Sequence, residues 1–103
     1  MPDDDLLSHR RFVAEIQQAI RLANREVLHP IVDPLTDKKV IAVAVEVAKR
    51  RAEYIQATLN LGGPSKPSGE DLKSHRLAYE ESRDAFSELM TTIERGYVDL
   101  PAD

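Results

Sequence analysis

The sequence predicts an all-α fold, an up-down-up three-helix bundle with long antiparallel helices, in a single helical domain over residues 1–103. Two long segments place apolar residues at alternating steps of three and four, which is the spacing of one helix face. Proline and glycine stand between the segments, where they end helices. Only 5% of the residues are aromatic and none is Trp, so the core depends on aliphatic residues and Ala, which suits close helix packing.

The first helix is expected over residues 4–29. Aspartates fill its first turn, where carboxylates favour the positive end of the helix dipole. Pro30 ends it, because a residue before proline is disfavoured in the α conformation. Its apolar seam consists of Leu6, His9, Val13, Ile16, Ile20, Ala23 and Val27.

The second helix is expected over residues 36–60, with Thr36 as N-cap and the glycines of the 61–68 loop as its end. From Ile41 to Val47, isoleucine and valine alternate with alanine and glutamate, which also fits a β-strand. The chain offers no second strand to pair with it, and a helix-favouring stretch follows. A helix is therefore predicted.

The third helix is expected over residues 69–97. Ser68 stands three residues before Asp71, as in a capping box with Asp in place of Glu or Gln. Gly96 falls at the predicted end. The apolar seam of this helix is the most regular of the three, and consists of Leu72, His75, Tyr79, Ser82, Phe86, Leu89 and Ile93.

Charge and composition exclude several classes of protein. The chain carries 14 Lys and Arg against 18 Asp and Glu, a net charge of −4. This acidic balance argues against a nucleic-acid or anionic-membrane partner, both of which require a basic surface. The absence of Cys excludes disulfides and Cys-based zinc sites. The start of the sequence lacks the build of a signal peptide, so a cytoplasmic location is expected.

The second helix carries more apolar surface than one buried face requires. One stripe contains Ile41, Ala44, Val45, Ala48, Ala52, Ile55 and Leu59, and a second stripe is displaced by more than a quarter turn. An exposed aliphatic stripe is typical of a partner surface, so we predict a homo-oligomer or another protein partner. Alternatively, each stripe packs on a helix of the same chain. The predicted interface residues are Val40, Val43, Val47 and Tyr54.

The pattern D-L-x-S-H-R occurs twice, beginning at Asp5 and at Asp71. Asp and His four residues apart share a helix face, a workable spacing for metal ligands. If the hairpin loop is centred near residue 65, Gln56 lies near the level of the histidines and Asn60 near that of the aspartates. The aspartates and histidines could bind a divalent metal such as zinc. Alternatively, the aspartates only stabilise the helix starts through the helix dipole. The metal-ligand candidates are Asp5, His9, Asp71 and His75.

The sequence contains no nucleophile elbow and no Walker-type phosphate loop. We therefore predict no catalytic residues and no cofactor. The expected function is that of a non-enzymatic helical protein–protein interaction module that self-associates through its second helix. The alternative is a small metal-binding or enzymatic helical bundle that uses the Asp/His layer.

Overall fold

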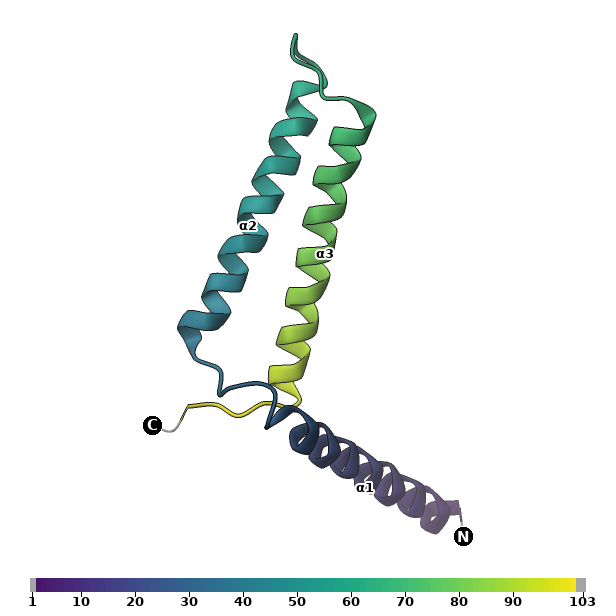
Figure 1. The fold of residues 1–103 in the computed structure, drawn as a ribbon. Helices are drawn as coiled ribbons and strands as arrows, with labels where there is room; N and C mark the ends of the chain where they lie inside the picture. The colour runs from purple at the N-terminus through teal and green to yellow at the C-terminus, as the bar shows by residue number, and fades with distance from the viewer. Residues whose placement is uncertain (1, 102–103) are drawn as a thin grey trace. The chain divides into compact units, whose positions relative to one another are not determined.

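The computed structural model describes residues 2–101 and shows three helices in this range (Figure 1). They are α1 (Pro2–Leu28), α2 (Asp37–Asn60) and α3 (Gly69–Glu94). No strand occurs among the described residues, and the ambiguous 41–47 stretch is helical. The predicted all-α fold class, with three long helices, is confirmed.

The chain divides into two compact units, which we describe separately. One unit contains Thr36–Thr91, that is, α2 and nearly all of α3. The other contains Met1–Leu35 together with Thr92–Asp103, so that α1 and the C-terminal segment belong to the same unit. Among the described residues, no helix is long and apolar enough to cross a membrane.

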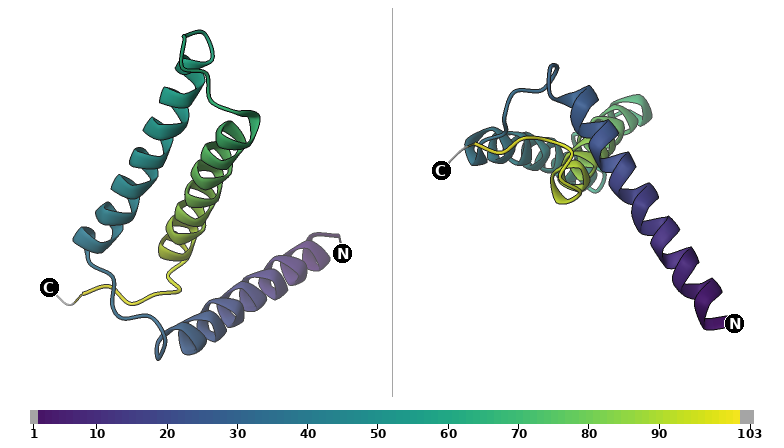
Figure 2. Two further views of the ribbon diagram at one scale, coloured as in Figure 1. Left: turned by 45° about the horizontal axis from the view of Figure 1, so that its top comes forward. Right: turned by 90° about the horizontal axis from the view of Figure 1, so that it is seen from below.

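Within the first of these units, α2 and α3 run antiparallel, joined by the 61–68 loop (Figures 1 and 2). Both helix starts use the predicted caps. The hydroxyl of Thr36 accepts a hydrogen bond from the Lys39 backbone N–H at 3.2 Å, and the Ser68 hydroxyl accepts one from the Asp71 N–H at 3.0 Å. Each hydroxyl satisfies a backbone donor that the first helical turn leaves free.

The end of α3 falls three residues before the predicted position 97. Gly96 has φ +72°, and its N–H donates to the Ile93 carbonyl at 3.0 Å, while the Tyr97 N–H donates to Thr92 at 3.0 Å. These two bonds form a Schellman motif, which requires a left-handed residue at the position after the C-cap. The glycine therefore terminates the helix, as its place in the sequence predicts.

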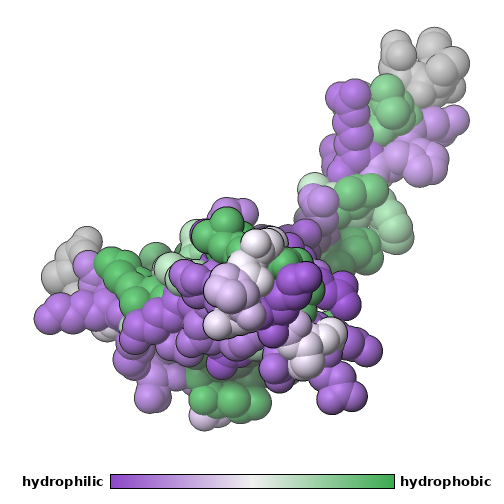
Figure 3. All heavy atoms as spheres, turned by 90° about the horizontal axis from the view of Figure 1, so that it is seen from above, coloured by the Kyte–Doolittle hydropathy of each residue, from purple (hydrophilic) through white to green (hydrophobic). Residues whose placement is uncertain are grey.

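In the other unit, α1 ends at Leu28, next to the predicted stop at Pro30. The apolar seam of α1 is open: its large apolar side chains are 44–63% exposed. Figure 3 shows exposed apolar side chains (green) lying among polar side chains (purple) at the surface. These exposed side chains are Leu6, Leu7, Phe12, Val13, Ile16, Ile20, Leu22 and Val27.

Candidate functional site: the two faces of helix α2

The α3-facing side of α2 carries the contacts that hold the hairpin together. Val47 is 6% exposed and borders a groove to which α3 contributes Ala85. The rings of Tyr54 and Tyr79 stack with centroids 6.2 Å apart. Of the predicted interface residues, Val47 is thus buried on the α3 side and Tyr54 stacks on Tyr79 of the same chain. Val43 borders the same groove as Val47, and Val40 is partly exposed.

Two arginines flank the Tyr79 ring. The Arg51 guanidinium lies 5.2 Å and that of Arg83 5.5 Å from the ring centroid. Arg51 also donates from Nε to the Tyr79 hydroxyl at 3.2 Å. This hydrogen bond is the main reason that the pKa of Tyr79 lies below its ordinary value, and the charges of both arginines add to it. Arg51 is thus turned toward α3.

The opposite side of α2 is open. We call this the outer stripe, defined as the six apolar residues that repeat at steps of four and three along the helix. Its large side chains are 47–68% exposed, and its two alanines are exposed as well. The α3 side of α2 already holds the hairpin through Val47 and Tyr54, and of the outer stripe Ala52 borders the groove that Asp71 and His75 of α3 line. Its members are Ile41, Val45, Ala48, Ala52, Ile55 and Leu59.

The four metal-ligand candidates fall two in each unit. In α1, His9 places Nδ1 2.7 Å from the backbone carbonyl of Asp5, a contact within one helical turn. In the hairpin, Asp71 and His75 line one groove. Among the described residues, no group of three or more His, Asp or Glu side chains is arranged to hold a metal ion.

The groove beside His75 contains the two amides whose level the sequence predicted. Gln56 and Asn60 of α2 line it together with Asp71 and His75, and Gln56 donates to the Asn60 side-chain oxygen at 3.2 Å. The register about residue 65 is therefore correct within the hairpin. The rest of its lining includes three apolar residues, Ala52, Ala57 and Pro67, so the groove is an open surface of mixed polar and apolar character.

A second cluster, which the sequence did not predict, lies at the end of α1. The Asp99 carboxylate accepts from Arg25 at 2.9 Å and contacts His29 Nδ1 at 2.5 Å. Arg25 also donates to the Gly96 carbonyl at 2.9 Å, and the Leu35 N–H donates to the Asp99 carbonyl at 2.9 Å. We call the Arg25–His29–Asp99 cluster the clamp, because it fastens the C-terminal segment to α1.

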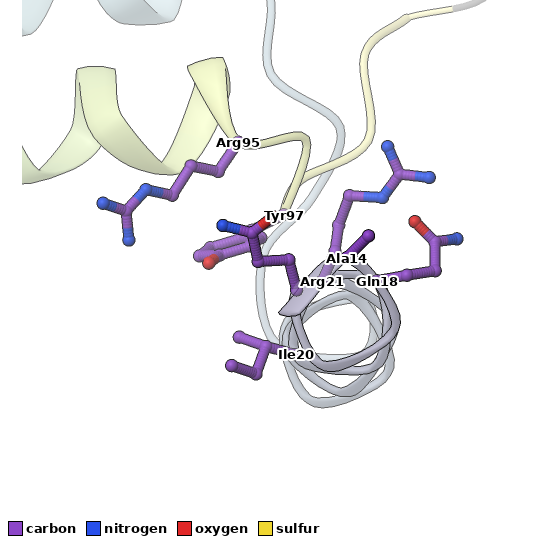
Figure 4. A pocket seen from close by; sticks show the side chains of 7 residues that line it. Ala14, Gln18, Ile20, Arg21, Arg95 and Tyr97 are labelled. Carbon is purple, nitrogen blue, oxygen red and sulfur yellow. The ribbon is translucent and has the colours of Figure 1, made fainter. Parts of the chain in front are cut away.

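The same unit contains a hollow between α1 and the C-terminal segment, bordered by Arg21, Arg95 and Tyr97 (Figure 4). The Arg95 guanidinium points away from the side chains of α1 in this view. The two cationic groups therefore do not converge on one point, as an anion site requires.

Comparison of the chain with protein-family models, with curated proteins and with solved structures gives no match.

Proposed function

We propose that the protein is a non-enzymatic helical interaction module that self-associates through α2, using the outer stripe. One observation carries the proposal: a regular apolar seam on α2 stays exposed after the other side of the helix has packed on α3. Exposed apolar patches of this kind mark protein–protein contacts, because covering them removes apolar surface from water. A cytoplasmic setting belongs to the same proposal.

The small interior of the hairpin supports this function. Among the described residues of the Thr36–Thr91 unit, only Val47 and Ala57 are buried. A two-helix unit with so little buried apolar surface has little hydrophobic stabilisation of its own. Association through the outer stripe would add apolar burial, and would stabilise the folded state as concentration rises.

The test is sedimentation equilibrium over a concentration series, with circular dichroism as a check on folding. We expect the wild-type protein to self-associate and Val45→Glu to be a folded monomer, because Val45 is 47% exposed and its carboxylate would stay hydrated in the monomer. Leu77→Glu is the matched control, since Leu77 is 41% exposed but lies on α3, and it should associate like wild type. Wild-type protein that stays monomeric at the highest concentration would contradict the proposal.

A further inference from the structure

We infer that the outer stripe of α2 binds the outer stripe of a second copy in antiparallel orientation, with a two-fold axis at the level of residue 50. This inference rests on the proposed function and specifies its partner and its geometry. It depends on three observations: the symmetry of the stripe, the distribution of residue size along it, and the charges on its flanks.

The outer stripe is symmetric about residue 50 in position and in size. An antiparallel pair centred there places Ile41 opposite Leu59 of the second copy, Val45 opposite Ile55, and Ala48 opposite Ala52. A surface that complements itself in this way is what a two-fold, isologous interface requires. Large side chains therefore face large ones, and small side chains face small ones.

The size distribution also suits two crossed helices. In one preferred packing class, that of coiled coils, two helices cross at about 20° and their axes approach within roughly 8–10 Å at the crossing point. Ala48 and Ala52 lie at the centre of the stripe, where the axes are closest and only small residues fit. Isoleucine and leucine at the two ends of the stripe fill the wider gap away from the crossing.

Charge favours the antiparallel orientation over the parallel one. On the helical wheel, Lys49 follows one flank of the outer stripe, with Glu53 just behind it, and Arg51 follows the other flank. A parallel pair brings opposite flanks together, so Lys49 would face the flank of Arg51 of the second copy, whose guanidinium is held by its own Tyr79, and would meet no carboxylate of the second α2 there.

An antiparallel pair brings equal flanks together. Lys49 and Glu53 of each copy then form a cluster of two cations and two anions, in which each lysine lies within about one helical turn of the partner's Glu53. On the other flank, the two Arg51 residues face each other, but each guanidinium is held by Tyr79 of its own chain. The repulsion between them is therefore reduced.

The contact is small. The stripe runs over about 27 Å of helix at 1.5 Å per residue, and a contact between two helices of this length belongs with interfaces of less than about 1,200 Å², which are typical of weak and transient complexes. The association therefore depends strongly on protein concentration, and the experiments below use the concentrations at which wild-type protein is associated.

The decisive experiment uses single cysteines, because the natural chain has none. Ala48→Cys and Ala52→Cys proteins are oxidised separately and as an equimolar mixture, and the covalent dimer is measured on a non-reducing gel. In the antiparallel register, position 48 faces position 52 within disulfide reach, whereas two copies of position 48 are offset by about 6 Å along the axis. We expect the covalent dimer to form in the mixture and to be absent when either variant is oxidised alone.

The outcomes distinguish the inference from the function on which it rests. Cross-linking of each single variant alone would indicate a parallel pair and overturn the inference, while self-association stands. A wild-type dimer that Val45→Glu leaves intact, with no cross-link in any sample, would overturn both, because the contact would lie elsewhere. A wild-type monomer would also overturn both, and the stripe would then be covered by another part of the chain or by another protein.

A charge reversal provides an independent measurement that does not depend on oxidation. Lys49→Glu should weaken the antiparallel dimer, because it places four carboxylates in the cluster, and the swap Lys49→Glu with Glu53→Lys should restore it. In a parallel dimer, Lys49→Glu would instead strengthen association, because the new carboxylate would lie beside Arg51 of the second copy. Strengthening in the sedimentation series would therefore overturn the inference.

Discussion

Arg51 and Tyr79 are joined twice, by a 3.2 Å hydrogen bond from the guanidinium to the phenol oxygen and by the guanidinium lying 5.2 Å from the ring centroid. This pair links the middle of α2 to the middle of α3 and fixes the register of the hairpin. It also turns Arg51 away from the outer stripe. The same contact thus sets the α2–α3 packing and leaves the apolar seam on the other side of α2 accessible.

The Arg51–Tyr79 pair predicts an early tyrosine ionisation. In a Tyr54→Phe, Tyr97→Phe background, tyrosinate absorbance should show Tyr79 ionising below its ordinary pKa of 10.0, because the Arg51 hydrogen bond favours the phenolate. Arg51→Met should move the midpoint up toward 10, and the control Lys49→Gln should leave it in place. An unchanged midpoint in Arg51→Met would show that Arg51 does not act on the phenol.

The pH dependence of stability follows from the sign of this shift. The pKa of Tyr79 is lower in the folded chain than in the unfolded chain, so the unfolded state binds more protons between the two pKa values. The contribution of Tyr79 to the free energy of unfolding therefore rises with pH in that window, is complete above 10 and is lost as pH falls through the folded pKa. Urea titrations across the window should show the rise in wild type and lose it in Arg51→Met.

The register and the caps of the hairpin were predictable from local rules, but the role of each face of α2 was not. The loop centred near residue 65 is enough to place Gln56 and Asn60 beside His75 and Asp71. Both stripes of α2 are apolar, so periodicity alone cannot tell which one packs on α3. That choice depends on Tyr54 and Arg51 meeting one aromatic ring, and the sequence marks Arg51 only as a solvated charge.

The clamp was hidden from the sequence for a different reason. Asp99 lies 70 and 74 residues from His29 and Arg25, and no periodic pattern connects the positions. A single aspartate after the last helix has no local signature of pairing. The end of α3, by contrast, has a local signal in Gly96, and the left-handed backbone there shows that the glycine ends the helix.

The hairpin interior predicts a contrast between two valines on α2. Val47→Ala should lower the free energy of unfolding by about 2 kcal/mol, because it removes two buried methyl groups. Val45→Ala, which truncates a side chain that is 47% exposed, should change it by about 0.5 kcal/mol or less in dilute protein. Urea unfolding measures both, and equal effects would mean that the two faces of α2 are not distinct.

The clamp predicts local loosening without global unfolding. Asp99→Asn removes the charge that Arg25 and His29 share, and since these groups are partly exposed, we expect a loss of less than about 1 kcal/mol. The heteronuclear ¹H–¹⁵N nuclear Overhauser effects of the backbone amides at 97–100, which report backbone mobility, should nevertheless fall, because the C-terminal segment loses its side-chain anchor. Asp84→Asn is the control, since that carboxylate pairs with the adjacent Arg83 on α3, and it should leave those amides unchanged.

The two ends of α3 predict different effects of a glycine-to-alanine change on the free energy of unfolding: a loss at Gly96 and no loss at Gly69. Gly96 has φ +72°, and an L-residue in this left-handed conformation costs roughly 1–2 kcal/mol. An added Cβ would meet only Arg21 Cδ at 3.7 Å, an ordinary contact, so backbone strain accounts for the whole effect. Gly96→Ala should therefore lower the unfolding free energy by about 1 kcal/mol. Gly69→Ala adds a Cβ with nothing within 4 Å at the start of α3 and should be neutral or slightly stabilising, because alanine favours helix more than glycine. Equal losses in the two variants, measured by urea unfolding, would rule out the Schellman motif as the reason that α3 ends at Glu94.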